Sequence, residues 1–347
     1  MKNDDLIKKI IETIPNCSRI TENDQNLYNE FFKTERKKYP YHYTRSWIFI
    51  KQISQGLGIR YFDKKKEHLI TIAPNWGGSV PNYVYLPLGV NAVESVPFLI
   101  KQLSKVLGGK ITVKKVYGEE NRNFLLKNGA KEQSSDHGLS DDRYPEIVCD
   151  VDSIIKAALG FPTEIKMDSF KEHIRKIRRK ISVIDYEVQE KKLSRKLEEE
   201  FKNLIDKWSS DIAERTVKQL GGKSEVRELK KWMGQVYYPY FIKELIENVE
   251  GEELIAYLTF IDGKPVGFTS AYPVSDSCLA VNGALSDTKY RGLIQYLFFS
   301  LAIKAKNLGY RYLNLGSSDN EQQHQYKSSM GKIYEAQLYI LEFDPKV

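Results

Sequence analysis

The chain has 347 residues, the length of two ordinary domains rather than one. Hydrophobic residues make up 41% of it and aromatic residues 12%, which is enough for folded cores and excludes wholesale disorder. Cys17, Cys149 and Cys278 lie far apart, which argues against a disulfide framework or metal site and favours a reducing, cytoplasmic location. The net charge of +7 permits anionic partners without requiring them.

No part of the sequence has the character of a membrane-spanning segment. A spanning helix needs roughly 18 or more uncharged apolar residues, and no window approaches that length. The N-terminal stretch is charged and amphipathic, unlike a signal peptide. Contact with a membrane is therefore expected to be peripheral at most.

The first half of the chain predicts a helical start followed by a mixed sheet. Residues 1–35 are expected to be helical with polar breaks, and the pattern becomes strand-like over 47–76. Within that stretch, strands at 58–62 and 68–73 flank a charged turn. The half is completed by a strand at 83–86, a helix that ends at Gly108-Gly109 and a strand at 111–116.

A polar and helical region separates the two halves. Residues 132–145 are rich in Ser, Asp and Gly and predict a loop. A helix over 168–183 carries an apolar face made of Phe170, Ile174, Ile177 and Ile181. A second amphipathic helix follows, with apolar residues at helical spacing over 193–208, and Gly221-Gly222 ends it.

The last hundred residues repeat the order of the first half. Two apolar strands meet at the tight turn Asp262-Gly263, and a strand, a helix that ends at Gly309 and a further strand follow. Phe124 and Gly129 recur 202 positions later as Tyr326 and Gly331. A chance spacing of glycines is the alternative, but the shared order of elements favours duplication.

We therefore predict an α/β (α+β) fold of two tandem lobes, each a mixed sheet flanked by helices. The expected division is an N-terminal lobe at 1–150, a basic and amphipathic helical connection at 151–250, and the core of a catalytic C-terminal lobe at 251–347.

Three stretches resemble known families. Residues 284–318, ALSDTKYRGLIQYLFFSLAIKAKNLGYRYLNLGSS, resemble the core of the GNAT acyltransferase fold. QYKSSMGKIYE at 325–335 resembles the Tyr/Phe-Lys-x-x-x-Gly segment of FemABX-type aminoacyltransferases. Residues 141–160 and 170–181 resemble the C-terminal domain of phosphatidylglycerol lysyltransferases. The resemblance implies two tandem GNAT-like lobes. The lysyltransferases' transmembrane module and a clear FemABX-type hairpin arm have no counterpart in this sequence.

The resemblance places a donor-binding loop at Tyr290, Arg291, Gly292 and Gln295. Acyl-CoA enzymes of this fold have small residues in the loop, so that backbone N–H groups can approach a pyrophosphate at a helix N-terminus. Ile294 and Tyr296 stand where small residues would be needed, which favours a donor other than acyl-CoA. A simple turn before a helix is the alternative.

Three residues are candidates for catalysis. Lys327, in the FemABX-like segment, would stabilise a tetrahedral oxyanion or hold the donor's phosphate, and Tyr326 would shape the pocket. Asp319 would accept the amine proton, a role for which Asp287 and His324 are the other candidates. A surface lysine, a core tyrosine and a solvated loop acid are the alternatives.

The loop after the last strand is a candidate acceptor site, because open α/β sheets bind ligands beyond the carboxyl ends of their strands. Its small and polar members are Gly316, Ser317, Ser318 and Asn320.

The helix at 168–183 also carries a basic cluster. A tRNA backbone or anionic headgroups are possible partners, and a solvated outer face is the alternative. The residues concerned are Lys171, Arg175, Arg178, Arg179 and Lys180.

These features favour an N-acyltransferase that moves an aminoacyl group from aminoacyl-tRNA to an amine or hydroxyl of a small molecule, peptide or lipid headgroup. The alternatives are an acyl-CoA-dependent N-acyltransferase and a non-catalytic protein that binds anionic ligands. No tightly bound cofactor and no metal are expected, because direct attack by a positioned amine needs neither.

Overall fold

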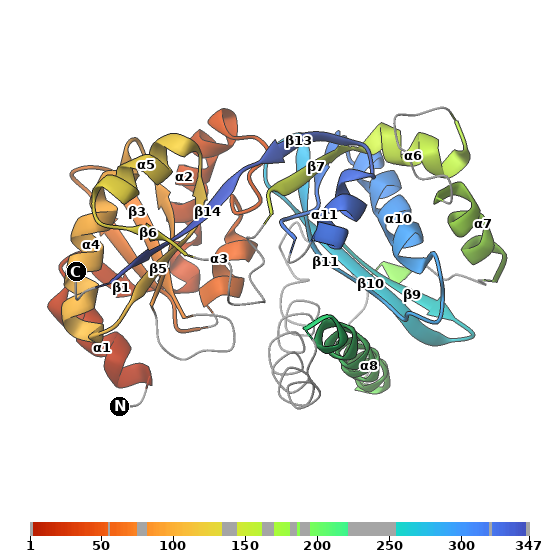
Figure 1. Ribbon diagram of the computed structural model, residues 1–347, viewed down its shortest axis with the longest axis horizontal. Helices are drawn as coiled ribbons and strands as arrows, with labels where there is room; N and C mark the ends of the chain where they lie inside the picture. The colour runs from red at the N-terminus through yellow and green to blue at the C-terminus, as the bar shows by residue number, and fades with distance from the viewer. Residues whose placement is uncertain are drawn as a thin grey trace. The chain divides into compact units, whose positions relative to one another are not determined.

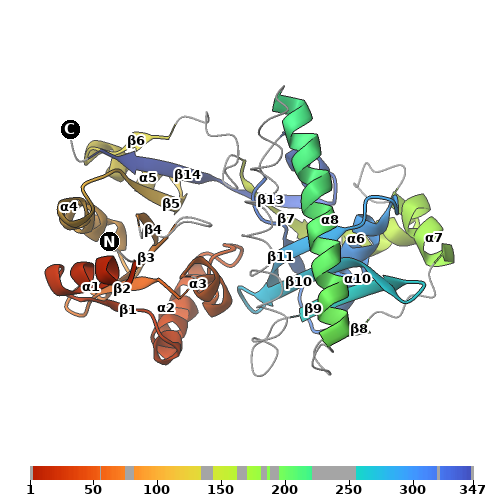
Figure 2. The ribbon, with the colours of Figure 1, turned by 90° about the horizontal axis from the view of Figure 1, so that it is seen from below.

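The structure is a computed structural model that describes residues 3–54, 56–74, 82–133, 144–161, 170–180, 186–187, 195–220, 255–318 and 321–344. Over these residues the chain forms two compact units, each with a seven-stranded sheet flanked by helices (Figures 1 and 2). The two-lobed α/β prediction is therefore confirmed. The first unit contains Met1–Ile147, Gly316–Tyr326 and Tyr334–Val347, and the second contains Val148–Leu315 and Lys327–Ile333.

The first unit is built on the strand order β1-β2-β3-β4-β5-β14-β6. Its strands are β1 (Cys17–Arg19), β2 (Ile59–Asp63), β3 (His68–Ala73), β4 (Tyr83–Leu88), β5 (Ile111–Tyr117), β6 (Lys131–Glu132) and β14 (Leu338–Phe343). Its helices are α1 (Asn3–Thr13), α2 (Gln25–Lys38), α3 (Trp47–Ser54), α4 (Val96–Leu107) and α5 (Glu119–Lys127), with 3₁₀ turns η1 (Glu22–Asp24) and η2 (Ala92–Ser95).

Helix α3 corrects the strand-like reading of the segment that begins at Trp47. Seven of its eight residues are buried, including Ile48, Phe49, Ile50 and Ile53. A helix that is buried on nearly every side has no polar face, so its sequence lacks the periodicity that distinguishes helix from strand.

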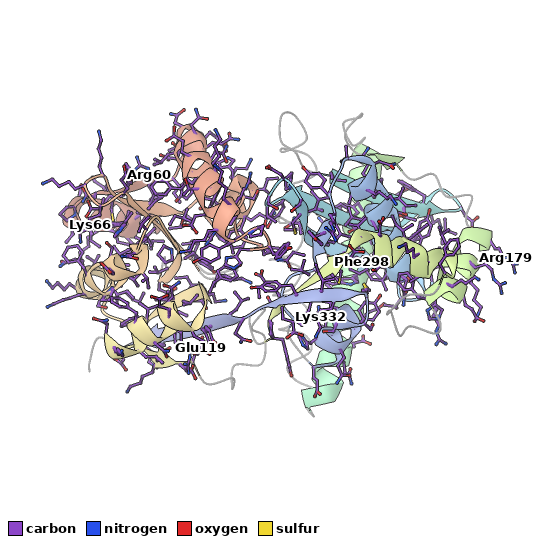
Figure 3. All side chains as sticks on the ribbon, turned by 90° about the horizontal axis from the view of Figure 1, so that it is seen from above. Arg60, Lys66, Glu119, Arg179, Phe298 and Lys332 are labelled. Atoms are coloured by element: carbon purple, nitrogen blue, oxygen red, sulfur yellow. The ribbon has the colours of Figure 1, made fainter. Side chains whose placement is uncertain are left out.

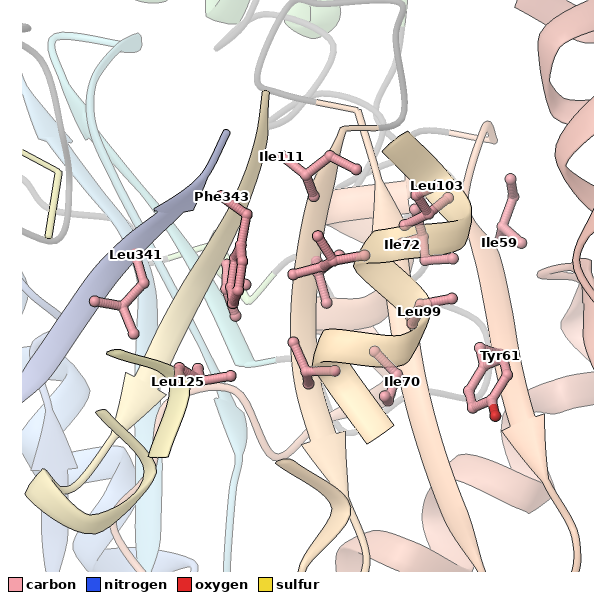
Figure 4. Close-up of a cluster of buried hydrophobic side chains, with 14 of the residues drawn as sticks. Ile59, Tyr61, Ile70, Ile72, Leu99, Leu103, Ile111, Leu125, Leu341 and Phe343 are labelled. Atoms are coloured by element: carbon pink, nitrogen blue, oxygen red, sulfur yellow. The ribbon is translucent and has the colours of Figure 1, made fainter. Parts of the chain in front are cut away.

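The core of the first unit lies between the sheet and a layer that includes α1 and α4. Leu99 and Leu103 of α4 are buried in one cluster with Ile70 and Ile72 of β3 (Figure 4). Leu341, near the end of the chain, belongs to the same cluster. The last strand is thus part of the core of the first unit.

The second unit has the strand order β13-β7-β12-β11-β10-β9-β8. Its strands are β7 (Glu146–Asp150), β8 (Tyr186–Glu187), β9 (Ile255–Ile261), β10 (Lys264–Pro273), β11 (Cys278–Ser286), β12 (Tyr312–Asn314) and β13 (Lys332–Ala336). Its helices are α6 (Val151–Leu159), α7 (Phe170–Lys180), α8 (Arg195–Leu220) and α10 (Leu293–Asn307), and α11 (Glu321–Ser328) follows β12 in the chain.

Helices cover both faces of the second sheet. Phe201 of α8 packs edge to face on Phe268 of β10 with ring centroids 5.2 Å apart. The neighbouring Gly267 faces Leu297 of α10. Because successive residues of a strand point to opposite faces, α8 and α10 lie on opposite sides of the sheet. The apolar face expected on α7 is confirmed by the burial of Phe170, Ile174 and Ile177, whereas Ile181 lies outside the described residues.

The two sheets repeat one topology. β2-β3-β4-β5 and β9-β10-β11-β12 each end in a parallel pair, β4 with β5 and β11 with β12. The tight turn Asp262-Gly263 forms as expected, with both residues at positive φ. The glycines that match between the halves, Gly108 with Gly309 and Gly129 with Gly331, all have positive φ.

The compact units are not continuous in the chain. β14 pairs with β5 in the first sheet, and β7, which precedes the second repeat, pairs with β12 in the second. The division at residues 150 and 250 stays a prediction. It treated the lobes as continuous segments and so did not include the pairing of β14 with the first sheet or of β7 with the second. No helix among the described residues is both long and apolar enough to cross a membrane.

Candidate functional site

The turn between β11 and α10 carries the donor-binding residues expected from the sequence. Gly292 is the N-cap of α10 with φ +97°, a conformation that favours glycine. A Cβ atom on Gly292 would lie 2.7 Å from Cβ of His173 and 3.0 Å from its carbonyl oxygen. The absence of a side chain at Gly292 therefore allows helix α7 to pack closely against the N-terminus of α10.

The first turn of α10 points into the protein. Leu293, Gln295 and Tyr296 are buried, and Oε1 of Gln295 has no hydrogen-bond partner among the described residues. Burial, followed by the charge of Arg291, lowers the pKa of His173, so this histidine packs beside the turn as a neutral ring. This packed arrangement agrees with the presence of Ile294 and Tyr296 where acyl-CoA enzymes of this fold have small residues.

Gly292→Ala is expected to destabilise the second unit by more than Gly309→Ala does. Both glycines have positive φ, which costs a non-glycine residue roughly 1–2 kcal/mol, but only open space surrounds Gly309. At Gly292 the methyl group must also displace α7, which adds about 1–3 kcal/mol of overpacking. Equal losses of stability in denaturant titrations of the two variants would show that the approach of α7 is not tight.

Helix α7 presents the basic residues. Lys171, Arg175 and Arg179 are exposed, whereas the side chains of Arg178 and Lys180 lie outside the described residues. Figure 3 shows Arg179 at the margin of the second unit. Lys171 lies against Gly160 at the end of α6. Exposed guanidinium groups on a helix whose other face is buried remain available to an anionic partner.

Lys327 lies in the last turn of α11 and is half-buried. Its carbonyl oxygen accepts hydrogen bonds from N of Met330, at 3.1 Å, and from Sγ of Cys149, at 3.7 Å. Burial raises the pKa of the Cys149 thiol to about 12, an effect that the nearby charge of Lys327 opposes. Burial also raises the pKa of Tyr326 above its usual range, and Asp319 lies outside the described residues.

The acceptor loop expected at 316–320 is held by backbone contacts. Gly316 O accepts a hydrogen bond from N of Ile147, and Ser318 forms an isolated antiparallel bridge with Tyr144. Ser318 is buried, and Oγ of Ser317 accepts a hydrogen bond from Nζ of Lys115 at 3.3 Å. Asn320 lies outside the described residues.

Lys115 belongs to a buried polar cluster that sequence reasoning missed. The carboxylate of Glu146 is fully buried and accepts hydrogen bonds from Oη of Tyr117, at 2.8 Å, and from N of Tyr43, at 3.2 Å. Nζ of Lys115 lies 3.8 Å from the same carboxylate. Burial, followed by the charge of Glu146, raises the pKa of Tyr117, so the phenol stays protonated.

A β-bulge directs Lys115 into this cluster. The pairing of β14 with β5 slips between Tyr339 and Leu341, and Lys115 has φ +57°, which is unusual for a side chain other than glycine. The only sequence signal was a pair of lysines inside an apolar strand, and Glu146 lies 31 positions further along the chain. Among the described residues, no group of three or more His, Cys, Asp and Glu side chains is placed to hold a metal ion.

Residues 165–336 match the family model described as phosphatidylglycerol lysyltransferase, C-terminal. No curated protein matches the chain by sequence. Among solved structures, a conserved protein from Bacteroides thetaiotaomicron is 13% identical, with a TM-score of 0.63 over 95% of this chain and 100% of that one.

Two further structures share the fold. L-PGS from Bacillus licheniformis is 13% identical, with a TM-score of 0.53 over 92% of each chain. A tandem GNAT protein from the clavulanic acid biosynthesis pathway is 10% identical, with a TM-score of 0.53 over 95% of this chain and 98% of that one. The chain therefore has the tandem GNAT-like fold, and the match of its residues 165–336 to a lysyltransferase family supports an enzyme of the aminoacyltransferase type.

Proposed function

We propose that the chain transfers an aminoacyl group from aminoacyl-tRNA to an amine or hydroxyl of a small molecule, peptide or lipid headgroup. The observation that carries the proposal is the family match over 165–336, which contains α7, the turn at Gly292 and Lys327. The packing of His173 against Gly292 supports it, because a cradle for the pyrophosphate of acyl-CoA needs open space at such a helix N-terminus.

The proposed reaction needs no covalent enzyme intermediate. The acceptor nitrogen or oxygen attacks the ester carbonyl of the donor, a tetrahedral oxyanion forms, and the bond to the ribose oxygen of the tRNA breaks. The proton lost by the acceptor ends on the ribose hydroxyl, with Asp319 as the proposed relay. Lys327 stabilises the oxyanion and Tyr326 shapes the pocket around it.

The test is a donor comparison with purified protein. We expect label to pass from at least one member of a full set of radiolabelled aminoacyl-tRNAs to an acceptor drawn from simple amines, peptides and anionic phospholipid vesicles. Acetyl-CoA should give no product and no calorimetric binding signal. Turnover of acetyl-CoA together with micromolar binding, about −8 kcal/mol, would overturn the donor assignment.

We expect the basic helix α7 to contact tRNA phosphates. Replacing Arg175, Arg178 and Arg179 together by Gln should weaken tRNA binding and flatten its dependence on salt. Each lost phosphate contact removes roughly 0.9 from the log–log slope on duplex nucleic acid. Filter binding at several salt concentrations measures the slope.

The control removes the same charge from the first unit. Lys8 and Lys9 of α1 and Lys105 of α4 are exposed, and their replacement by Gln lowers the net charge equally. If both triple variants change the salt dependence of tRNA binding equally, the effect comes from the net charge of the protein. The basic face of α7 is then merely solvated and makes no specific contact with tRNA.

A further inference from the structure

The first unit contains a cavity whose lining includes none of the residues proposed for aminoacyl transfer. Its volume is about 570 Å³, the size of a site for a small organic ligand. One wall is a face of α2, with Leu27, Glu30, Phe31, Thr34, Glu35 and Lys38 at helical spacing. At 1.5 Å per residue this wall is roughly 17 Å long, so the cavity has two distinct ends.

The outer end is aromatic and acidic. Phe31 and Phe62 meet edge to face with centroids 6.1 Å apart. Glu30 adjoins Phe31 in the chain, and Glu67 and Phe31 both approach Gly89. Glu94 is a further exposed carboxylate of the cavity lining, which also contains the exposed cation Lys66, at the margin of the unit in Figure 3. An excess of carboxylates beside aromatic rings attracts organic cations, and here it occurs in a chain whose net charge is +7.

The inner end has a hydrogen-bonding position without a partner. His42 is 5% exposed and is stacked between Tyr39 and Tyr117, with centroids 4.6 and 3.6 Å away. Its Nδ1 has no hydrogen-bond partner among the described residues. Burial lowers the pKa of His42 to about 2, so the ring is neutral and does not repel a cation.

Each cation in the lining near His42 has a carboxylate nearby. Lys38, which lies over the ring of Tyr39, is exposed and is within the electrostatic influence of Glu35 and Glu120. NH2 of Arg45 lies 3.1 Å from Oε2 of Glu35, and both side chains are almost fully buried. Lys115 lies beside the carboxylate of Glu146. The inner wall therefore carries little net charge, and the carboxylates at the outer end decide the charge preference of the cavity.

We propose that this cavity is a binding site for an organic ammonium ion on an aromatic or apolar body, with a hydroxyl or amide group at its inner end. The ammonium lies among Glu30, Glu67 and Glu94, the body packs on Phe31 and Phe62, and the polar group approaches His42. The proposal is independent of the transfer reaction, because binding alone tests it.

Three probes of one shape test the proposal by calorimetry and ligand-observed NMR on the full chain. Tyramine has the ammonium and the hydroxyl, phenethylamine lacks the hydroxyl, and 3-(4-hydroxyphenyl)propionate replaces the ammonium by a carboxylate. We expect tyramine to bind most tightly, phenethylamine less tightly, and the propionate at least about tenfold more weakly than tyramine, a difference of about 1.4 kcal/mol. Equal or tighter binding of the propionate, or no binding of tyramine at millimolar concentration, would overturn the proposal.

A charge variant locates the binding. The double substitution Glu67→Gln and Glu94→Gln should weaken tyramine binding by about fivefold, because each exposed carboxylate contributes a fraction of a kcal/mol. Glu12→Gln on α1, which is exposed and outside the cavity lining, is the control and should change nothing. Tyramine affinity that the double variant leaves intact would place the binding elsewhere and contradict the assignment.

Discussion

Replacement of Lys327 by Met is expected to lower the rate of aminoacyl transfer on the order of 100-fold or more. Lys327 lies in the segment that resembles aminoacyltransferases, and its backbone is fixed at the end of α11 by bonds to Met330 and Cys149. A preorganised cation that stabilises the charge of a tetrahedral intermediate is lost in the variant, and removing one such group typically has this effect. Single-turnover rates with the donor identified by the donor comparison are the measurement.

The steady-state parameters distinguish the two proposed roles of Lys327. Loss of oxyanion stabilisation lowers kcat, whereas loss of a contact to the donor's phosphate mainly weakens donor binding. Lys264→Met removes an exposed lysine at the start of β10 and is the matched control. Unchanged rate and unchanged donor affinity in Lys327→Met would show that the chemistry lies elsewhere in the protein.

Local features were readable from the sequence because their physical causes are local. The turn Asp262-Gly263 requires positive φ at both residues, and its position between two apolar runs predicted the hairpin. The apolar stripe of α7 follows from its 3.6-residue period. The matching glycines Gly129 and Gly331 end equivalent helices, so the duplication was visible from their common offset.

Features that depend on distant pairing were not readable. The strand β14 completes the first sheet more than 200 positions after β5, and nothing in its own apolar pattern specifies that partner. The cluster around Glu146 combines this carboxylate with Lys115 of β5 and Tyr43. Its residues are ordinary in sequence, and only the bulge that turns Lys115 inward brings them together.

The turn at Gly292 illustrates how one sequence signal fits two structures. A glycine before a helix permits the close approach of another group, and the sequence alone does not say whether that group is a phosphate or a protein backbone. In this chain the neighbour is His173 of α7. The bulky Ile294 and Tyr296 favoured a donor other than acyl-CoA, and they gave no indication that α7 would be the neighbour.

Replacement of Leu341 by Ala is expected to cost about 2–5 kcal/mol of stability in the first unit. Leu341 is fully buried, its strand pairs with β5 and β6, and it shares a cluster with Ile111, Val113 and Leu125 (Figure 4). Truncation leaves a cavity in this core, and the lost burial and the cavity both destabilise the unit. Leu308→Ala is the matched control, because Leu308 is exposed and its truncation should change stability by less than about 0.5 kcal/mol.

Region-resolved hydrogen exchange shows which unit the last strand supports. A chain of two compact units need not unfold in one step, so a single melting temperature would not separate them. In Leu341→Ala, amides of β5 should exchange faster by the fold-change that corresponds to the lost stability, whereas amides of β11 should keep their protection. A division of the chain at residue 251 makes the opposite forecast, since it assigns Leu341 to the second lobe. Loss of protection in β11 before β5 would therefore contradict the pairing of β14 with the first sheet and favour folding units that are continuous in sequence.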